Sequence, residues 1–253
     1  MPAIASVHLA DVEPGAALRL LAPGGGPGAV AGLRQGHLAT AAPLTPDAVP
    51  RPPLGRVGFV AFWDDDAALD RFLAGHPLAE RLAGGWRARL EPLRRHGTWP
   101  GLDDDVTQAR RTGHTGPAVV LTLGRVRIAQ VPRFLRTSAR AEAAALAAPG
   151  CTWATALARP PFVGTCSLWT SAEALSAYAY GSPGAGHPAA MAADRDEPFH
   201  HRSAFVRFRP YDVQGSLDGD NPLAPGALVE PPAPAAPAAS EPAARPEPAP
   251  GRG

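Results

Sequence analysis

Short runs of apolar, β-branched and aromatic residues alternate with amphipathic segments along most of the chain. The apolar runs predict buried strands, and the longer segments with helical periodicity predict helices. In the first half this pattern predicts strands over residues 4–9, 38–42, 56–63 and 86–93, and helices over residues 14–21 and 64–75 with a further turn to residue 82. Asp64 is the predicted N-cap of the second helix, because its side chain can accept a hydrogen bond from the first turn.

The second half repeats the same order of elements. Strands are predicted over residues 118–123, 152–158, 162–169 and 203–211, and helices over residues 131–148, 172–180 and 187–194. Thr170 is the predicted N-cap after the third of these strands. Both halves have the order β-α-β-β-α-β, which predicts two ferredoxin-like units, each an antiparallel sheet with helices on one face. The units are assigned to residues 1–100 and 117–219, with a polar connection over residues 101–116.

A direct sequence match favours an internal duplication. Residues 164–178 align with residues 58–72 without a gap, and this alignment places Trp169 on Trp63. The aligned strand is apolar on both faces, since alternate residues of a strand point in opposite directions. Packing the two sheets face to face would bury this surface. The sequence therefore predicts an α+β barrel closed within one chain, with a cavity between the sheets as the natural ligand site.

The composition narrows the range of partners. The chain has 253 residues and a net charge of +1, from 24 basic residues, all of them arginine, and 23 acidic residues. This balance gives no reason to expect nucleic acid or an anionic membrane as a partner. Cys151 and Cys166 are the two cysteines, with no CxxC motif, so neither a disulfide framework nor a zinc site is predicted.

The two ends of the chain differ in composition. The start shows no secretory signal, and no apolar run is long enough to span a bilayer, so a cytoplasmic protein is expected. Residues 222–253 consist almost wholly of proline, alanine, glutamate and glycine. Such a segment cannot bury enough apolar surface to offset the entropy lost on ordering, which predicts a disordered tail.

Three segments carry a resemblance to a known family. Residues 85–93, 158–169 and 198–211 are similar to motifs of the spheroidene monooxygenase family, in particular its actinobacterial branch, and the likeness covers roughly residues 1–219. The resemblance implies a haem-dependent oxygenase that inserts oxygen from O2 into an unactivated hydrocarbon and forms a ketone at a carotenoid end group. It also implies a hydrophobic small-molecule substrate, carotenoid- or polyketide-like, and an electron donor such as a ferredoxin.

Haem chemistry requires one axial ligand, an apolar pocket and an open face for O2. His187 is the first choice for the ligand, because it follows a glycine-containing loop that is longer in the second half than in the first. His76 occupies the corresponding place in the first half and serves as a control. His200 and His201 are the next candidates; as neighbours on a strand they face opposite ways, so at most one can point inward. The alternative is that all of these histidines are solvated or cap helices.

Other residues complete the predicted site. Arg207 and Arg209 share one face of the last strand and are candidates for binding haem propionates, or are the solvent face of an amphipathic strand. Cys166 is a conceivable thiolate ligand, but its place within an apolar strand favours a small buried hydrophobe. The predicted substrate pocket consists of Trp153, Phe162, Gly164, Trp169 and Tyr178, which are otherwise core residues.

The sequence thus favours a haem-dependent monooxygenase with a fused ferredoxin-like barrel. One alternative is a non-catalytic barrel of the same class that binds haem or a small apolar ligand. A structural or assembly protein that uses the tail for partner contacts is another.

Overall fold

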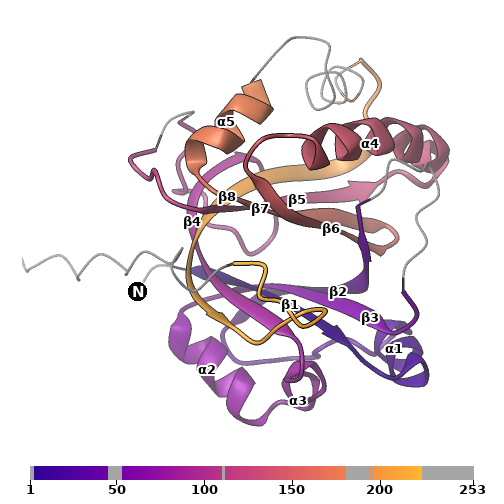
Figure 1. Ribbon diagram of the computed structural model, residues 1–253. Coiled ribbons are helices and arrows are strands. Elements are labelled where there is room, and N and C mark those ends of the chain that lie inside the picture. Colours follow the sequence, from indigo (N-terminus) through magenta and orange to yellow (C-terminus); the bar gives the residue numbers. More distant parts are fainter. Residues whose placement is uncertain (1–2, 45–52, 110–111, 181–193, 195, 224–253) are drawn as a thin grey trace, which may run out of the picture.

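The computed structural model describes residues 3–44, 53–109, 112–180, 194 and 196–223. Eight antiparallel strands close into a barrel, with helices on two opposite sides of it (Figure 1). The first half contains β1 (Ile4–Asp11), α1 (Pro14–Leu21), β2 (Leu33–Pro43), β3 (Arg56–Trp63), α2 (Asp66–Gly75), α3 (Pro77–Leu82) and β4 (Trp86–Gly97). The second half contains β5 (Ala118–Val126), the 3-10 turn η1 (Ile128–Gln130), α4 (Val131–Leu146), β6 (Cys151–Arg159), β7 (Phe162–Trp169), α5 (Ala172–Tyr180) and β8 (His200–Gln214).

The two halves have the same strand order. The closed order is β1-β3-β2-β6-β7-β5-β8-β4, so the first half reads β4-β1-β3-β2 and the second reads β8-β5-β7-β6. The antiparallel pairs β2–β6 and β4–β8 join the halves and leave no free sheet edge. The predicted fold class, two fused ferredoxin-like units packed as an α+β barrel, is confirmed. Common ancestry of the halves stays a prediction, which the equal strand order supports.

Most predicted elements are present, with differences at their ends. The strands β2, β4 and β8 are longer than predicted. Arg94 and Arg95 continue the ladder between β4 and β8, and residues 33–37 extend the ladder of β2 with β3. The N-caps lie one residue later than predicted. Asp65 accepts a hydrogen bond from the backbone N of Ala68 (2.9 Å), and Ser171 accepts one from Ala174.

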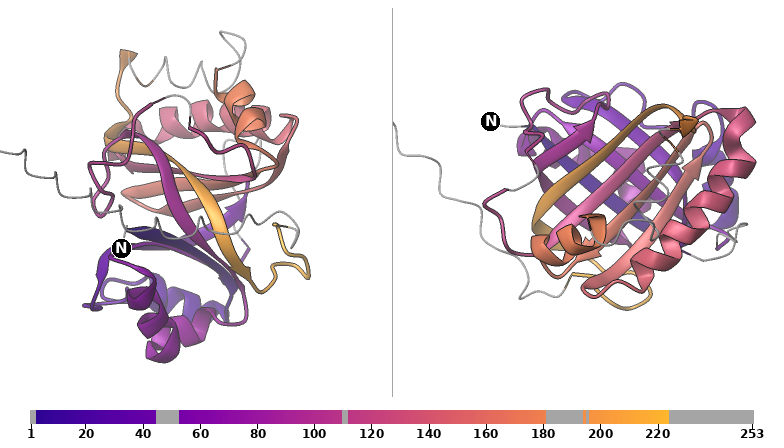
Figure 2. Two further views of the ribbon diagram at one scale, coloured as in Figure 1. Left: turned by 90° about the vertical axis from the view of Figure 1, so that its left-hand side faces the viewer. Right: turned by 90° about the horizontal axis from the view of Figure 1, so that it is seen from above.

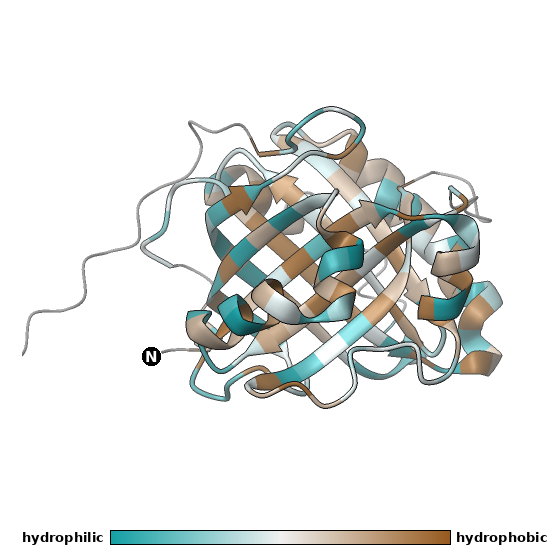
Figure 3. Ribbon diagram, turned by 90° about the horizontal axis from the view of Figure 1, so that it is seen from below, coloured by the Kyte–Doolittle hydropathy of each residue, from teal (hydrophilic) through white to brown (hydrophobic). Residues whose placement is uncertain are grey.

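The space between the sheets is filled by side chains. Inward-facing residues of all eight strands form one buried cluster. Alternate residues of β1 and β3 pack against the helices of the first half instead. Figure 3 shows apolar and polar residues interspersed along the strands. Trp99, Leu217 and Leu223 join this cluster from segments outside the strands, with exposed fractions of 6%, 6% and 4%. The predicted ligand cavity between the sheets is therefore wrong. Phe162 and the partly buried Trp153, two of the residues predicted to line the substrate pocket, pack within this cluster.

Buried indole groups find polar partners at the barrel interior. The Nε1 of Trp99 donates a hydrogen bond to Nε2 of His37 (3.1 Å), and the His37 ring stacks on Phe162 with centroids 4.3 Å apart. Burial lowers the pKa of His37 to about 4, so the ring is neutral and can accept this bond. The Nε1 of Trp86 donates to Oδ1 of Asn221 (3.0 Å). These bonds satisfy donors that would otherwise be buried without a partner.

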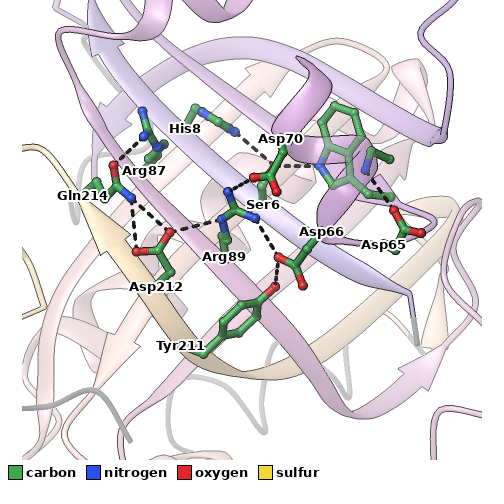
Figure 4. A network of polar contacts seen from close by, with 12 residues as sticks. Ser6, His8, Asp65, Asp66, Asp70, Arg87, Arg89, Tyr211, Asp212 and Gln214 are labelled. Atoms are coloured by element: carbon green, nitrogen blue, oxygen red, sulfur yellow. Dashed lines mark hydrogen bonds and ion pairs between the residues drawn. The ribbon is translucent and has the colours of Figure 1, made fainter. Parts of the chain in front are cut away.

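A polar network holds α2 on the first sheet (Figure 4). The guanidinium of Arg89 forms ion pairs with Asp66 (2.7 Å) and Asp70 of α2 and with Asp212 of β8 (3.1 Å). The hydroxyl of Tyr211 donates to the Asp66 carboxylate at 2.8 Å. Since Arg89 lies on β4, one side chain ties a helix and two strands together.

We expect the described C-terminal residues to support the barrel, whereas the sequence analysis placed them in the tail. A chain that ends at Asn221 loses the buried Leu223, so its thermal midpoint should fall by about 5–10 °C relative to the full chain. A chain that ends at Leu223 should have a thermal midpoint close to that of the full chain, because the residues removed, 224–253, are poor in large apolar side chains. Calorimetry distinguishes the two, and equal midpoints for both truncations would contradict this role of Leu223.

His8 should make stability dependent on pH. Burial, with smaller contributions from Arg87 and Arg89, lowers the pKa of His8 to about 3. The unfolded chain binds this proton near the usual pKa of about 6.5, so stability is lost as the pH falls from there towards 3. His8→Gln should reduce the loss by about 1.4 kcal/mol per pH unit between pH 6 and pH 4.

Urea unfolding at a series of pH values measures this difference between the wild type and His8→Gln. The exposed His201 provides the control, since His201→Gln should retain the wild-type slope. An unchanged slope in His8→Gln would show that His8 is protonated in the folded state.

Candidate functional site

The outer faces of the two half-barrels differ in how well the helices cover them. In the first half, every residue of β1 and β3 that faces the helices is buried: Ile4, Ser6, His8, Ala10, Val57, Phe59, Ala61 and Trp63. In the second half, several residues at the matching places of β5 and β7 remain half-buried: Val120, Thr122, Val163, Thr165 and Ser167. We call these five residues the open face. The strand pairing fixes the match, because Ile4 pairs with Trp63 in the first half and Ala118 pairs with Trp169 in the second.

The difference in burial between the two outer faces arises from the residues at the centre of each sheet. His8 and Phe59 are directly paired, and their rings lie 5.9 Å apart under Phe72 of α2. The corresponding pair in the second half is Thr122 and Thr165. Two small side chains stand where two rings stand in the first half, so the helices above them leave the face partly exposed.

The second helical layer also contributes few buried residues. In α4 only Ala139 and Ala145 are buried, and in α5 only Ala172 and Leu175. Figure 2 shows the long α4 along one margin of the sheet and the short α5 across a corner. Between the C-terminal end of α4 and α5, a small apolar pocket of about 290 Å³ is lined by Ala148, Pro149, Ala174, Ala177 and Tyr178. The helices thus frame the open face.

His200 lies at one margin of the open face. A Cβ at Gly124 would lie 2.6 Å from the His200 ring, so the glycine provides the space for this imidazole. Phe134 of α4 packs against the ring edge-on with centroids 5.3 Å apart. The Nδ1 lies 3.3 Å from Oδ1 of Asp194 without a well-aligned hydrogen bond. Burial lowers the pKa of His200, and the Asp194 carboxylate opposes this shift.

None of the other histidine candidates is placed by the structure at the open face. His201 is exposed, in agreement with the expectation that only one of the two neighbours points inward. His187 lies outside the described residues. His76 caps α3, where its Nδ1 accepts a hydrogen bond from the backbone N of Leu78 (3.1 Å) and its Nε2 lies 3.0 Å from the carbonyl of Pro27. Both ring nitrogens of His76 are therefore engaged in structure.

The two candidate arginines have different partners, although both are buried on the outer face of β8. Arg209 forms an ion pair with Glu91 of β4, with Nε 2.6 Å from Oε2. Arg207 donates from NH2 to Oγ of Ser176 in α5 (3.1 Å) and forms no ion pair with the described residues. Arg207 is therefore the better placed of the two for an anionic group of a ligand.

The predicted substrate-pocket residues do not form one pocket. Phe162 and Trp153 belong to the barrel interior, whereas Trp169 of β7 packs on the outer face against Tyr178 of α5, with ring centroids 5.0 Å apart. A Cβ at Gly164 would lie 2.7 Å from the carbonyl oxygen of Thr122, so this glycine permits close strand pairing. The shell of the barrel separates the two groups.

The cysteines provide no thiolate. Cys166 is fully buried inside the barrel, and burial raises the pKa of its thiol to about 12. Cys151 is half-buried with a raised pKa for the same reason. Among the described residues, no group of three or more histidine, cysteine, aspartate or glutamate side chains is arranged to hold a metal ion.

Sequence reasoning missed Arg94, Gly124 and Asp194. Gly124 lies within an apolar strand and carries no signal that distinguishes it from a packing glycine. Asp194 precedes His200 by six residues, but no spacing rule for a helix or a strand predicts their contact. The position of Arg94 depends on a register shift in β4, between Pro92 and Arg94, which residue alternation does not reveal.

Comparisons with known proteins give structural similarity alone. No family model matches the chain, and no curated protein matches it. Among solved structures, an aldoxime dehydratase in complex with butyraldoxime is 10% identical, with 83% of this chain and 79% of that chain covered and a TM-score of 0.47. A monooxygenase-like protein from Listeria innocua is 14% identical (80% and 93% covered, TM-score 0.29). A haem-degrading enzyme from Listeria monocytogenes is 14% identical (79% and 98% covered, TM-score 0.28).

These similarities assign no activity to this chain, because the identities and TM-scores are low. Within the described part of the chain, none of the helices combines the length and the apolar character needed to cross a membrane.

Gly124 should be required for the position of His200. Gly124→Ala places a methyl group against the imidazole, and we expect a loss of about 1–3 kcal/mol in the free energy of unfolding. His200→Ala removes the clash, so the double variant should recover most of this loss, giving a coupling energy measurable in a double-mutant cycle. Gly84→Ala is the control, because a Cβ there meets no atom within 4 Å. Simple additivity of the two substitutions would contradict the contact.

Proposed function

We propose that the chain binds haem on the outer face of its second half and acts as an oxygenase on a hydrophobic substrate. The observation that carries this proposal is the difference between the two outer faces. The same strand order produces a closed face under α1–α3 and a half-exposed face under α4 and α5. A flat, mainly apolar group would cover the open face as the rings of His8 and Phe59 fill the first one.

The residues present fit such a group. The open face combines apolar and small side chains, namely Val120, Val163 and the methyl groups of two threonines. An imidazole and a guanidinium lie at its margins, in His200 and Arg207. Haem requires these three features: an apolar surface, a nitrogen ligand and cationic partners for its carboxylates.

Each residue has a distinct role in this proposal. His187 would be the residue that holds the haem iron, since the sequence places it after α5, which frames the open face. His200 has a lowered pKa, so at neutral pH its imidazole is uncharged and able to accept a proton, and the Asp194 carboxylate lies 3.3 Å from its Nδ1. The bound haem would supply the O2 chemistry, and its apolar surface would displace water from the half-exposed face.

The finer assignments come from the sequence resemblance. We infer a carotenoid- or polyketide-like substrate and an electron donor such as a ferredoxin, because a monooxygenase needs an external source of electrons. A shared ancestry of the two halves, with one outer face later opened for a ligand, would account for equal topology and unequal packing. A non-catalytic barrel that binds haem without turnover would show the same face.

Titration of the purified full chain with haemin tests the proposal. A stoichiometric Soret band should form, and His187→Ala should shift or abolish it while the protein stays folded. His76→Ala is the matched control, because His76 caps α3 in the first half, and its replacement should leave the spectrum unchanged.

Three outcomes separate the candidate functions. No Soret band with the wild-type chain contradicts haem binding altogether. A normal band in His187→Ala that is lost in His200→Ala transfers the axial role to His200. A normal band without oxygen consumption, when reductant and a hydrophobic substrate are supplied, favours the non-catalytic barrel.

A further inference from the structure

Two arginines lie side by side across the seam between the halves. In the β4–β8 ladder, Arg94 is directly paired with Arg207. Glu91 is paired with Arg209 in the same ladder, which gives a pair of opposite charges a short distance away. Directly paired like charges in a sheet destabilise it, and opposite charges stabilise it. The seam therefore contains one neutralised pair and one repulsive pair.

The repulsive pair is buried. Arg94 and Arg207 are 8% and 7% exposed, and both point to the side of the sheet covered by α5. The NH1 of Arg94 donates to the hydroxyl of Tyr180 at 2.6 Å, and the NH2 of Arg207 donates to Oγ of Ser176 at 3.1 Å. The Nε of Arg207 is buried without a hydrogen-bond partner among the described residues.

A buried guanidinium is costly unless an anion accompanies it. Burial and the neighbouring Arg94 both lower the pKa of Arg207, as expected for a cation that lacks a counter-charge. Arg207 forms no ion pair with any carboxylate in the described part of the chain, and residues 181–193, which follow α5 in sequence, include neither aspartate nor glutamate. The hydroxyl groups of Ser176 and Tyr180 supply dipoles but no negative charge.

We propose that Arg207 and Arg94 form a carboxylate-binding site for the ligand of the open face. The fork of an arginine side chain matches the two oxygens of a carboxylate, and the unsatisfied Nε of Arg207 supplies one of the donors. Ser176 and Tyr180 border the site from α5. A haem propionate and a free organic acid present the same carboxylate to this site. The site rests on the proposed function only in the choice between these two ligands.

Binding measurements on the full chain distinguish these sources. The probes are haemin, haemin dimethyl ester, whose propionates are blocked, and glutarate as a free dicarboxylate. For the wild type, haemin should bind more tightly than its ester, and Arg207→Gln should weaken haemin binding by about ten- to a hundredfold. The ester should bind Arg207→Gln as it binds the wild type.

Arg209→Gln is the matched control. Arg209 lies on the same strand and face, but Glu91 neutralises it. Its replacement should leave the affinity for haemin unchanged and lower the thermal midpoint, because it leaves the half-buried carboxylate of Glu91 without its partner. Arg207→Gln should keep or raise the midpoint, since it removes a repulsion. If Arg207→Gln fails to fold, Arg94→Gln provides the same test from the other strand.

The possible results fall into separate classes. Glutarate binding that is lost in Arg207→Gln, without haemin binding, supports the carboxylate site and contradicts the haem proposal. The carboxylate site is contradicted if the wild type binds haemin and its dimethyl ester with equal affinity and Arg207→Gln binds haemin as tightly as the wild type does. This result leaves the haem proposal intact. Binding of none of the probes to the wild type overturns the carboxylate site.

Discussion

The structure depends on closing one sheet without free edges inside a single chain. A ferredoxin-like sheet on its own has an apolar face and two edges with unpaired backbone groups. Here the pairs β2–β6 and β4–β8 remove the edges, and the inward faces of both halves fill the interior with one apolar cluster. Trp99, Leu217 and Leu223 complete this cluster from loops. Among the described residues, the interior is therefore packed with apolar side chains that stabilise the barrel.

The outer faces show how one topology can serve two purposes. In the first half, large rings and the Arg89 ion pairs fix the helices to the sheet. In the second half, threonines replace the central rings, and α4 and α5 bury few residues. Packing free energy scales with buried apolar area, so the described helices of the second layer gain less from packing than those of the first. Binding surfaces are commonly found in such less stable regions.

Much of the fold was predictable because strand and helix periods are local properties. The runs 56–63 and 162–169 were identified to the residue as β3 and β7. The interior was not, because Trp99 and Leu223 lie in segments without periodicity and reach the barrel only through the fold. The same limit applies to the candidate site. Arg207 was identified from strand alternation, but its pairing with Arg94 depends on the register shift in β4. The sequence also suggested equal roles for Arg207 and Arg209. The structure distinguishes them, because Glu91 forms an ion pair with Arg209.

The length of β8 has a mechanical consequence. His200 and Arg207 of this strand contact α4 and α5 of the second helical layer, while Tyr211 contacts Asp66 of α2 and Asp212 forms an ion pair with Arg89 of β4. No hinge divides the strand where one half ends and the other begins, and its ladder with β4 continues along most of its length. The two halves can thus separate only if the backbone hydrogen bonds between β4 and β8 are broken. The two halves should melt in a single cooperative transition, and slow amide exchange should extend along β8 from one helical layer to the other.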